Sequence, residues 1–305
     1  MIPFPAITAV IPTHNRPEQM KRALESVLAQ DYAGPIEVII VFDAEEPYLP
    51  DVEIPATRTV ITTVNQRSRG LAGARNSGID AASHDYVAFL DDDDWWRPGK
   101  LTAQMPLFEG RPDVLLVGTA IVLDDGERLH ERLIPVGEVT HEVLLRDRIA
   151  GLHSSTFVFR KAALQGAVGM VDEELPGSYG EDYDLLLRTT RVGAIGIVNE
   201  PLVSVTWSQN SYFFGKWGAY AEGLEYLLQA HPGFLRDKKA HGRIAGQIAF
   251  ARASNGERPV ARRWARTALR NDPTQAKAWL TLAISYRLMS ASWVARTAQR
   301  FGKGI

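Results

Sequence analysis

The 305-residue sequence contains no cysteine, no long apolar run and no basic segment ahead of its first apolar residues. Without thiols the chain forms no disulfide bond and no thiolate metal site, a composition compatible with a reducing cytosol. The longest apolar run, Val114 to Leu123, falls well short of the roughly 20 residues that a membrane-spanning helix needs. Because Pro3, Pro5 and Pro12 interrupt the N-terminal apolar stretch, we expect neither a secretory signal nor a transmembrane helix.

Net charge is small as well, −2 at pH 7, but it is unevenly distributed. The segment from Arg236 to Lys303 contains 15 Lys and Arg but only 3 Asp and Glu, so it is strongly basic while the rest of the chain is acidic. Such asymmetry favours a separate C-terminal unit and an acidic partner. A hydrophobic content of 45% suits a globular protein, and 305 residues allow one large domain and a smaller one.

Apolar strands alternate with helical patterns in the first 90 residues. Strands are predicted at Ile7 to Ile11, Ile36 to Phe42, Arg58 to Thr62 and Tyr86 to Leu90. Between the first two, Pro17 begins a helix whose apolar residues recur every three or four positions. This order predicts βαβ units and an α/β fold with a mainly parallel sheet that is flanked by helices.

Polar residues follow the predicted strands at the points where they end. They are Thr13, Asp43, Asn65 and Asp91. Because ligands of open parallel sheets bind beyond the carboxyl ends of the strands, we expect these side chains to converge on one crevice.

Four consecutive carboxylates, Asp91 to Asp94, come directly after a buried strand and are followed by Trp95 and Trp96. Adjacent carboxylates repel, so some are driven towards protonation unless a cation lies among them. A solvated acidic turn is the simpler alternative, but the buried strand before the run and the tryptophan pair after it favour a site for a hard divalent cation.

The next part of the chain mixes strands and helices. A helix is predicted from Pro98 to Phe108, a strand from Val114 to Leu123 that turns at Asp125-Gly126, and a strand from Thr156 to Arg160. Another helix begins within Gly180 to Leu185, where three carboxylates stand in the first turn. The helix dipole alone accounts for any one of them, but not for all three.

Beyond Ser211 the pattern is helical only. One apolar stripe ends at Asn271-Asp272-Pro273 and a second follows it, which together resemble a single tetratricopeptide-like hairpin. The stripes consist of Ala261, Trp264, Ala265, Ala268 and Leu269, and of Ala276, Trp279, Leu282, Ala283 and Tyr286. We therefore expect a sheet domain over residues 1–211 and a helical region over residues 212–305.

Taken together, the motifs resemble those of the inverting glycosyltransferases of family 2, which have the GT-A fold. The resemblance covers roughly Ile7 to Ser211 and implies a nucleotide-sugar half, about residues 1–97, and an acceptor half, about residues 98–211. The motifs occur in the family's order and are Val10 to Arg16, Val41 to Asp43, Gly70 to Asn76, Phe89 to Trp95 and Gly180 to Leu185.

By this resemblance, Asp91 and Asp93 match the Asp-X-Asp motif that holds Mn²⁺ or Mg²⁺ against the diphosphate of a nucleotide-sugar. The metal acts as a Lewis acid that stabilises the departing diphosphate. The other residues that the resemblance assigns to the donor site are Thr13, Asn15, Asp43, Arg75 and Asp92.

Asp182 matches the carboxylate that acts as general base on the acceptor hydroxyl, so that a single displacement inverts the anomeric configuration. Glu181 and His153 match the acceptor region. The sequence departs from the family where a strand often carries a metal-binding His, because Trp207 stands in that stretch and cannot bind a metal.

The resemblance implies transfer from a nucleotide-sugar, by default a UDP-sugar, to a glycan or lipid-linked saccharide. We expect a cytoplasmic protein that contacts an anionic membrane surface through Arg296, Arg300 and Lys303, and no nucleic acid partner. Two alternatives stay open, a non-catalytic sugar-nucleotide sensor and a nucleotidyltransferase. An Asp-X-Asp-X-Thr phosphohydrolase does not match, because residue 95 is Trp, and an EF-hand does not match at Trp96 and Thr102.

Overall fold

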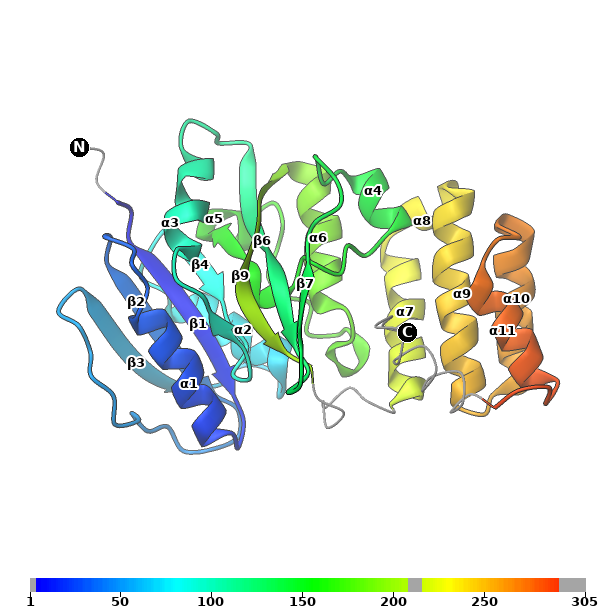
Figure 1. Ribbon diagram of the computed structural model, residues 1–305, viewed down its shortest axis with the longest axis horizontal. Helices are drawn as coiled ribbons and strands as arrows, with labels where there is room; N and C mark the ends of the chain where they lie inside the picture. Colours follow the sequence, from blue (N-terminus) through cyan, green and yellow to red (C-terminus); the bar gives the residue numbers. More distant parts are fainter. Residues whose placement is uncertain (1–3, 208–215, 291–305) are drawn as a thin grey trace. The chain divides into compact units, whose positions relative to one another are not determined.

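The computed structural model describes residues 4–207 and 216–290, which form two compact units. Residues 4–144, 148–173 and 181–207 make up a sheet unit, and residues 145–147, 174–180 and 216–290 make up a helical unit. Figure 1 shows the sheet unit in blue to green and most of the helical unit in yellow to red. None of the helices in the described ranges combines the length and the apolar character that crossing a bilayer requires.

Nine strands of the described chain form one mixed sheet, in the order β3-β2-β1-β4-β8-β6-β9-β5, with β7 paired to β6. Strands β1 to β4 are parallel to one another, β6 is parallel to β9, and the remaining pairs are antiparallel. The strands are β1 (Ile7–Thr13), β2 (Ile36–Phe42), β3 (Arg58–Val64), β4 (Tyr86–Phe89), β5 (Trp95–Trp96), β6 (Val114–Asp124), β7 (Leu129–Arg132), β8 (Val158–Arg160) and β9 (Ala194–Thr206).

Helix α1 (Pro17–Leu28) shows why the predicted βαβ units form. It begins at a proline, whose missing N–H is no loss in the first turn, and it buries the apolar stripe that the sequence predicts. The other helices and 3₁₀ turns up to the end of α6 are α2 (Leu71–Ala81), α3 (Lys100–Gln104), η1 (Met105–Phe108), α4 (His141–Arg146), η2 (Ser154–Thr156), α5 (Lys161–Leu164), η3 (Pro176–Ser178) and α6 (Glu181–Val192).

Helix α2 lies unusually close to its neighbours because of its glycines. A Cβ atom on Gly78 would stand 2.2 Å from Cγ1 of Val10 on β1, and one on Gly73 would stand 1.9 Å from the backbone oxygen of Ser68. Only glycine permits such an approach. The small residues of this segment thus bring α2 and its side chains against the sheet.

Two predicted elements are shorter than expected. The helix predicted over residues 98–108 becomes the α-helix α3 followed by the 3₁₀ turn η1, because Pro106 has no N–H to continue the α-helical hydrogen bonds. The strand predicted from Thr156 begins at Val158, since residues 154–156 form the turn η2. The turn predicted at Asp125-Gly126 does join two antiparallel strands, β6 and β7.

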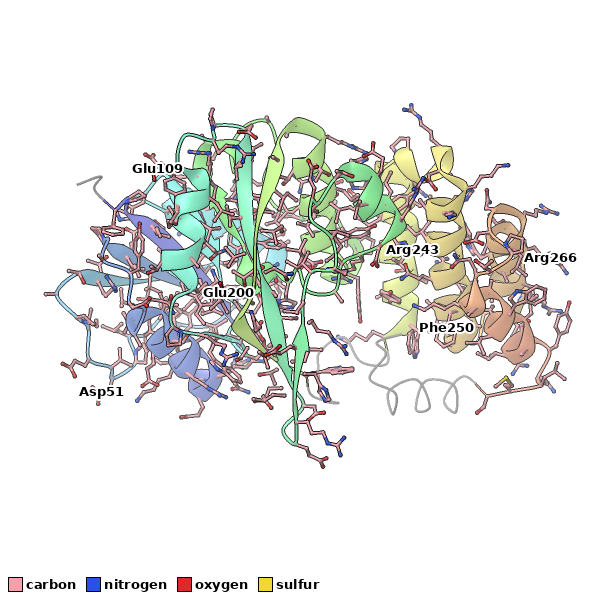
Figure 2. The ribbon with its side chains drawn as sticks, turned by 45° about the horizontal axis from the view of Figure 1, so that its top comes forward. Asp51, Glu109, Glu200, Arg243, Phe250 and Arg266 are labelled. Carbon is pink, nitrogen blue, oxygen red and sulfur yellow. The ribbon has the colours of Figure 1, made fainter. Side chains whose placement is uncertain are left out.

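The helical unit consists of antiparallel helices around α9, which contacts α7, α10 and α11. Its core is made largely of alanines, including Ala245 and Ala249 on α9 and Ala265 and Ala268 on α10. Their small side chains allow the helices to pack closely. Phe250, on the same helix as Arg243 (Figure 2), is buried with its ring 5.8 Å from that of Trp217. The helices are α7 (Trp217–Ala230), α8 (Gly233–Arg236), α9 (Lys238–Ser254), α10 (Arg258–Asn271) and α11 (Ala276–Ser285).

The apolar stripe predicted for α10 is buried or half-buried, but the one predicted for α11 is wrong in three places, because Ala276, Trp279 and Tyr286 are exposed. Trp279 and Tyr286 are 56% and 53% exposed, and α11 buries Ala278 and Ile284 instead. Both aromatic rings carry polar atoms that keep them at the surface: the Trp279 indole donates to the Pro273 carbonyl (2.9 Å).

Candidate functional site

The ends of the parallel strands bring together the polar residues that the sequence places there. On β1, the Thr13 hydroxyl donates to a carboxylate oxygen of Asp92, beyond β4 (2.9 Å). Beyond β2 and β3, the Asn65 amide donates to the Asp43 carboxylate (2.7 Å). These hydrogen bonds join Thr13 to Asp92 and Asn65 to Asp43 at the carboxyl edge of the sheet. A single crevice that is shared by Thr13, Asp43, Asn65 and Asp91 stays a prediction.

The loops around Asp43 are held in specific conformations. The other Asp43 carboxylate oxygen accepts a hydrogen bond from the backbone N–H of Gly70 (3.0 Å), just before α2. Asn15 has left-handed backbone (φ 53°), its backbone N–H donates to Glu45 (2.8 Å), and its side chain is exposed. Asp43 is therefore fixed in place, whereas the exposed Asn15 side chain contacts the neighbouring His14 ring (3.0 Å).

Each carboxylate of the acidic run has its own partners. Asp91 accepts from Arg75 and from the Ser154 hydroxyl (3.1 Å). Asp92 and Asp93 share one nitrogen of Arg16, at 3.0 and 2.8 Å. Two arginines therefore divide these three carboxylates between them.

Asp94 is the most deeply buried member of the run, and it is held by residues of two distant segments. One carboxylate oxygen accepts from the Ser155 hydroxyl (2.6 Å), and the other accepts from the backbone N–H of Thr206 at the end of β9 (3.1 Å). Trp207 follows immediately, and its backbone N–H donates to the carbonyl of Asp124 (2.8 Å). The end of β9 therefore borders the acidic run.

The electrostatics of the run follow from burial. Burial and the charges of Asp91 and Asp93 raise the pKa of Asp94 well above its usual range. Burial raises the pKa of Asp92 to about 6, although Arg16 opposes the shift, and burial and Asp91 raise the pKa of Asp93. The pKa of Asp91 is lowered, because Arg75 outweighs the effect of burial. Three of the four carboxylates are thus driven towards protonation, an effect that a bound cation reverses.

Three potential metal ligands in the described part of the chain lie close together: Asp91, Asp94 and His153 each offer a ligand atom within 4.8 Å of the others. Nδ1 of His153 lies 3.4 Å from a carboxylate oxygen of Asp94. Two carboxylates and an imidazole suit Mn²⁺, while Mg²⁺ prefers oxygen ligands. This group contains the predicted Asp91 but replaces Asp93 with Asp94 and adds His153, which the sequence assigns to the acceptor region.

Arg75 connects the acidic run to the helix that follows η3. Its side chain is fully buried, and it donates to Asp91, to Ser154 (3.0 Å) and to Glu181 at the start of α6 (2.8 Å). Burial alone would lower the pKa of Arg75, but the two carboxylates raise it. Burial raises the pKa of Glu181 to about 7, against the effect of Arg75.

Asp182 lies next to Glu181 and has a different environment. Both carboxylate oxygens accept from one nitrogen of Arg148 (2.8 Å each), and one of them also accepts from the N–H of Tyr183 (2.7 Å). Although Asp182 is buried, which raises its pKa, the charge of Arg148 outweighs this effect and the pKa is lowered. These contacts therefore favour the ionised form of Asp182.

Sequence reasoning did not identify Arg148, and it named Arg16 only as the last residue of a motif. Arg16 lies between the end of β1 and the start of α1, so its position in the sequence could have identified it as a residue at the strand end. Arg148 lies in a loop between α4 and η2 and is half-exposed. No periodicity or local motif distinguishes it from other surface arginines, so only the tertiary structure reveals its contact with Asp182.

The sequence and the fold can both be compared with known proteins. The model of the family Glycosyl transferase family 2 matches residues 8–166. The pre-mycofactocin glycosyltransferase of Mycobacterium tuberculosis is 32% identical over 80% of this chain, and the amylovoran biosynthesis glycosyltransferase AmsB of Erwinia amylovora is 28% identical over 62%. These matches span only 51% and 65% of the relatives' own lengths.

Two solved structures share the fold. S. aureus TarS 1-349, crystallised with UDP-GlcNAc, has a TM-score of 0.56 at 18% identity, with 97% of this chain and 92% of that chain covered. The mannosyltransferase PcManGT of Pyrobaculum calidifontis, in complex with GDP-Man and Mn²⁺, has a TM-score of 0.55 at 17% identity, with 97% and 84% covered. The mixed sheet and the C-terminal helices thus resemble those of GT-A glycosyltransferases, and the family match covers more than half of the sequence. The chain belongs to glycosyl transferase family 2.

Proposed function

We propose that this protein transfers a sugar from a nucleotide-sugar, a UDP-sugar by default, to a hydroxyl group of a glycan or lipid-linked saccharide, with inversion at the anomeric carbon. The observation that carries the proposal is the buried arginine, Arg75, which binds both Asp91 and Glu181 and so joins the acidic run to the helix of Asp182. The donors named for TarS and PcManGT and the polysaccharide named for AmsB support the substrate classes.

The donor lies at the carboxyl edge of the parallel strands in this proposal. Thr13, Asn15 and Asp43 contact the nucleotide, and Arg75 and Asp92 lie on the side of the diphosphate. Arg16 adds a cation at that position, between Asp92 and Asp93. The nucleotide-sugar half of the sheet domain, about residues 1–97, contains all of these residues.

The residues also fit a divalent cation. Asp91 belongs both to the pair expected from the sequence, Asp91 and Asp93, and to the group of Asp91, Asp94 and His153. When bound, Mn²⁺ or Mg²⁺ supplies Lewis-acid stabilisation of the diphosphate leaving group. The pKa values of Asp93 and Asp94 are raised. A bound cation restores the ionised form of both carboxylates, so the raised pKa values favour cation binding.

Asp182 acts as the general base. Its carboxylate takes the proton of the acceptor hydroxyl while the hydroxyl oxygen forms a bond to the anomeric carbon, and the bond from that carbon to the diphosphate oxygen breaks with its electron pair. Arg148 keeps Asp182 ionised and leaves it further lone pairs, because two carboxylate oxygens offer about four acceptor positions. Glu181, His153 and Trp207 border the acceptor.

The proposal is tested by incubating the protein with UDP-, GDP- and dTDP-sugars, with and without Mn²⁺, and a panel of glycan and lipid-linked acceptors. We expect Asp182→Asn to lower the transfer rate by about 10²–10⁴-fold and to leave donor binding intact. Asp80→Asn, which removes an exposed carboxylate paired with Arg67, is the matched control and should transfer normally. Metal-independent donor binding without transfer to any acceptor would instead support the non-catalytic sensor.

The proposed contact with the cytoplasmic side of an anionic membrane involves Arg296, Arg300 and Lys303, which lie outside the described residues. Neutralising all three should abolish a salt-sensitive binding to anionic liposomes. Binding that is absent or independent of salt would remove this part of the proposal.

A further inference from the structure

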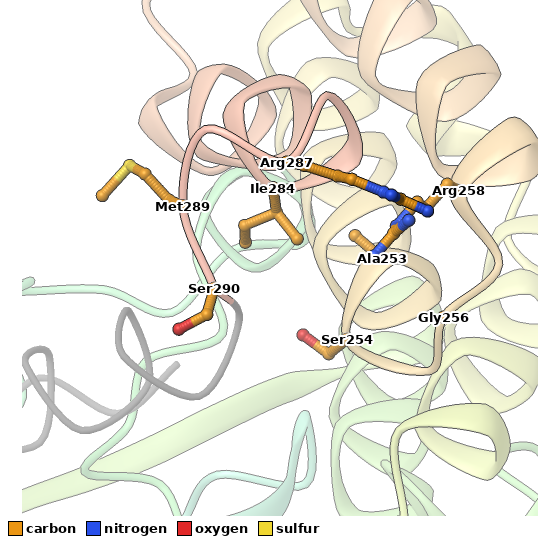
Figure 3. A pocket seen from close by; sticks show the side chains of 8 residues that line it. All are labelled: Ala253, Ser254, Gly256, Arg258, Ile284, Arg287, Met289 and Ser290. Atoms are coloured by element: carbon orange, nitrogen blue, oxygen red, sulfur yellow. The ribbon is translucent and has the colours of Figure 1, made fainter.

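The helical unit contains a cavity of about 480 Å³ between the ends of its helices. The end of α9, the start of α10 and the end of α11 form its walls (Figure 3). Ala253, Ile284 and Met289 give it an apolar side, while Arg258, Arg287 and Ser254 give it a polar one, and its lining among the described residues includes no carboxylate. The cavity is therefore amphipathic and positively charged.

Neither arginine of the cavity has an acidic partner in residues 4–207 and 216–290. A nearby arginine of the same unit shows the contrast: Arg252 pairs with Glu225 (2.7 Å) and Glu257 (3.0 Å). In Figure 3 the side chains of Arg258 and Arg287 extend towards the same end of the cavity. Two unneutralised guanidinium groups at one cavity repel each other, so this arrangement favours an anion between them.

A third group of the cavity lacks a partner. The hydroxyl oxygen of Ser254 is buried and makes no hydrogen bond within the described chain. Leaving a buried hydroxyl without a partner is unfavourable. An anion in the cavity would accept a hydrogen bond from it.

The sequence of α10 strengthens the positive field. Its arginines recur at every fourth position, which places them in one row on the helix surface. The row consists of Arg258, Arg262, Arg266 and Arg270, and α10 contains no Asp or Glu. Like charges four residues apart destabilise a helix. An anionic ligand at the Arg258 end of the row would offset part of this repulsion.

We propose that this cavity binds a phosphate group, as a phosphate ester or a diphosphate, through Arg258, Arg287 and the Ser254 hydroxyl. Guanidinium groups match phosphate oxygens with paired, charge-assisted hydrogen bonds, and two of them balance the charge of a dianion. A cavity of about 480 Å³ also has room for an apolar or sugar group attached to the phosphate. The site lies outside the residues proposed for sugar transfer, so it is a second binding function of this chain.

The first test uses the full chain and inorganic pyrophosphate in buffer that contains a chelator, so that no metal assists binding elsewhere. Titration calorimetry compares the wild type with the double variant Arg258→Gln/Arg287→Gln. Because neither side chain is in an ion pair, we expect the variant to remain folded, which its circular dichroism and melting temperature verify. Its affinity should fall at least about tenfold, as expected when hydrogen bonds to a charged ligand are lost.

The matched control is Arg263→Gln/Arg270→Gln, which also removes two positive charges from the helical unit but no residue of the cavity. It should keep nearly all of the affinity. Binding that is equally weakened in both double variants reports charge alone and overturns the site. Binding that is unchanged in the cavity variant overturns it as well, because the ion is then held elsewhere.

A second arm distinguishes a soluble phosphate from a lipid headgroup. Sedimentation with vesicles of phosphatidylcholine, with and without phosphatidylglycerol, is measured for the same three proteins. Loss of phosphatidylglycerol-dependent binding in the cavity variant alone, and competition by pyrophosphate, identifies the headgroup. Cavity-dependent pyrophosphate binding without vesicle binding identifies a soluble phosphate compound. If the wild type binds neither probe, the site is overturned, while the sugar-transfer proposal, which uses other residues, stands.

Discussion

The sheet unit and the helical unit differ in how their arginines are neutralised. At the carboxyl edge of the sheet, Arg16, Arg75 and Arg148 each contact at least one carboxylate that is largely buried. On α10 of the helical unit, a row of four arginines has no ion pair with any described residue of the chain. The two regions therefore carry positive charge for different reasons.

Burial explains the difference. A buried charge without a partner is costly. The buried Arg75 is therefore matched by two carboxylates, which it fixes in position, and the buried Arg58 is matched by backbone carbonyls. Exposed arginines are solvated and screened by salt, so repulsion along α10 costs little per pair. Removing a buried arginine of the sheet unit should consequently have a large cost, whereas removing an exposed arginine of α10 should have a small or even favourable effect.

The largest effect is expected for Arg75→Leu. This substitution leaves Asp91 and Glu181 close together and without their cation in a buried setting, and breaking a buried ion pair in this way typically costs about 3–5 kcal/mol. Urea denaturation should show the loss as a lower free energy of unfolding. Arg67→Leu is the control, because its pairs with Asp80 and Glu173 are partly exposed and contribute about 1 kcal/mol or less. Equal losses in the two variants would contradict the role given to burial.

The part of this site that sequence reasoning could predict is the part set by local order along the chain. Parallel strands with short connections leave their ends at one edge, so strand positions alone predicted that Thr13, Asp43, Asn65 and Asp91 lie at that edge. There Asn65 contacts Asp43, while Thr13 contacts Asp92, the neighbour of Asp91. The small residues of α2 likewise indicated a close approach to the sheet. Patterns of this kind depend on neighbouring residues and are visible in one sequence.

Contacts between distant segments could not be predicted. The position of Arg148 on Asp182 and that of His153 beside Asp94 depend on how loops fold over the sheet, and a single arginine or histidine in a loop has no pattern. The buried face of α11 was also misjudged, because Trp279 and Tyr286 fit the helical period and yet keep their polar atoms at the surface. Periodicity ranks residues by hydrophobicity and does not weigh such polar atoms.

The next largest effect is expected on Mn²⁺ affinity, and it tests whether the acidic run binds a metal ion in addition to its arginines. Asp91→Asn should weaken Mn²⁺ binding by at least about 10–100-fold, measured by titration calorimetry without donor, because Asp91 belongs to both candidate ligand sets. Asp92→Asn is the control, since its carboxylate is occupied by Thr13 and Arg16. A comparison of Asp93→Asn with Asp94→Asn then identifies the second ligand. Unchanged Mn²⁺ affinity in the Asp91 variant would remove the metal site.

A smaller effect is expected from Arg148→Gln, which separates the electrostatic role of an arginine from its structural one. Burial raises the pKa of Asp182, and Arg148 reverses this, so the variant should have a higher Asp182 pKa. Since only the ionised carboxylate accepts a proton, the acid limb of the pH profile of kcat/KM should move to higher pH by about one unit or more. Arg146→Gln, whose side chain pairs with Asp237 instead, should leave the limb in place. An unmoved limb in the Arg148 variant would show that Asp182 does not set the profile.

The smallest effect, and the one of opposite sign, is expected for Arg266→Gln on α10. Arg266 is exposed there (Figure 2) and stands four residues from Arg262 and from Arg270, so a neutral glutamine removes two repulsive pairs. At about 0.2–0.5 kcal/mol per pair, the free energy of unfolding of the helical unit should rise by roughly 0.5–1 kcal/mol in low salt. The gain should vanish near 1 M salt, where charges are screened within about 3 Å. In the same unit, Arg252→Gln should lower the stability, because that arginine is paired with Glu225 and Glu257. A loss of stability in the Arg266 variant at low salt would mean that the row on α10 is already neutralised, and that the two units do not differ in the way described.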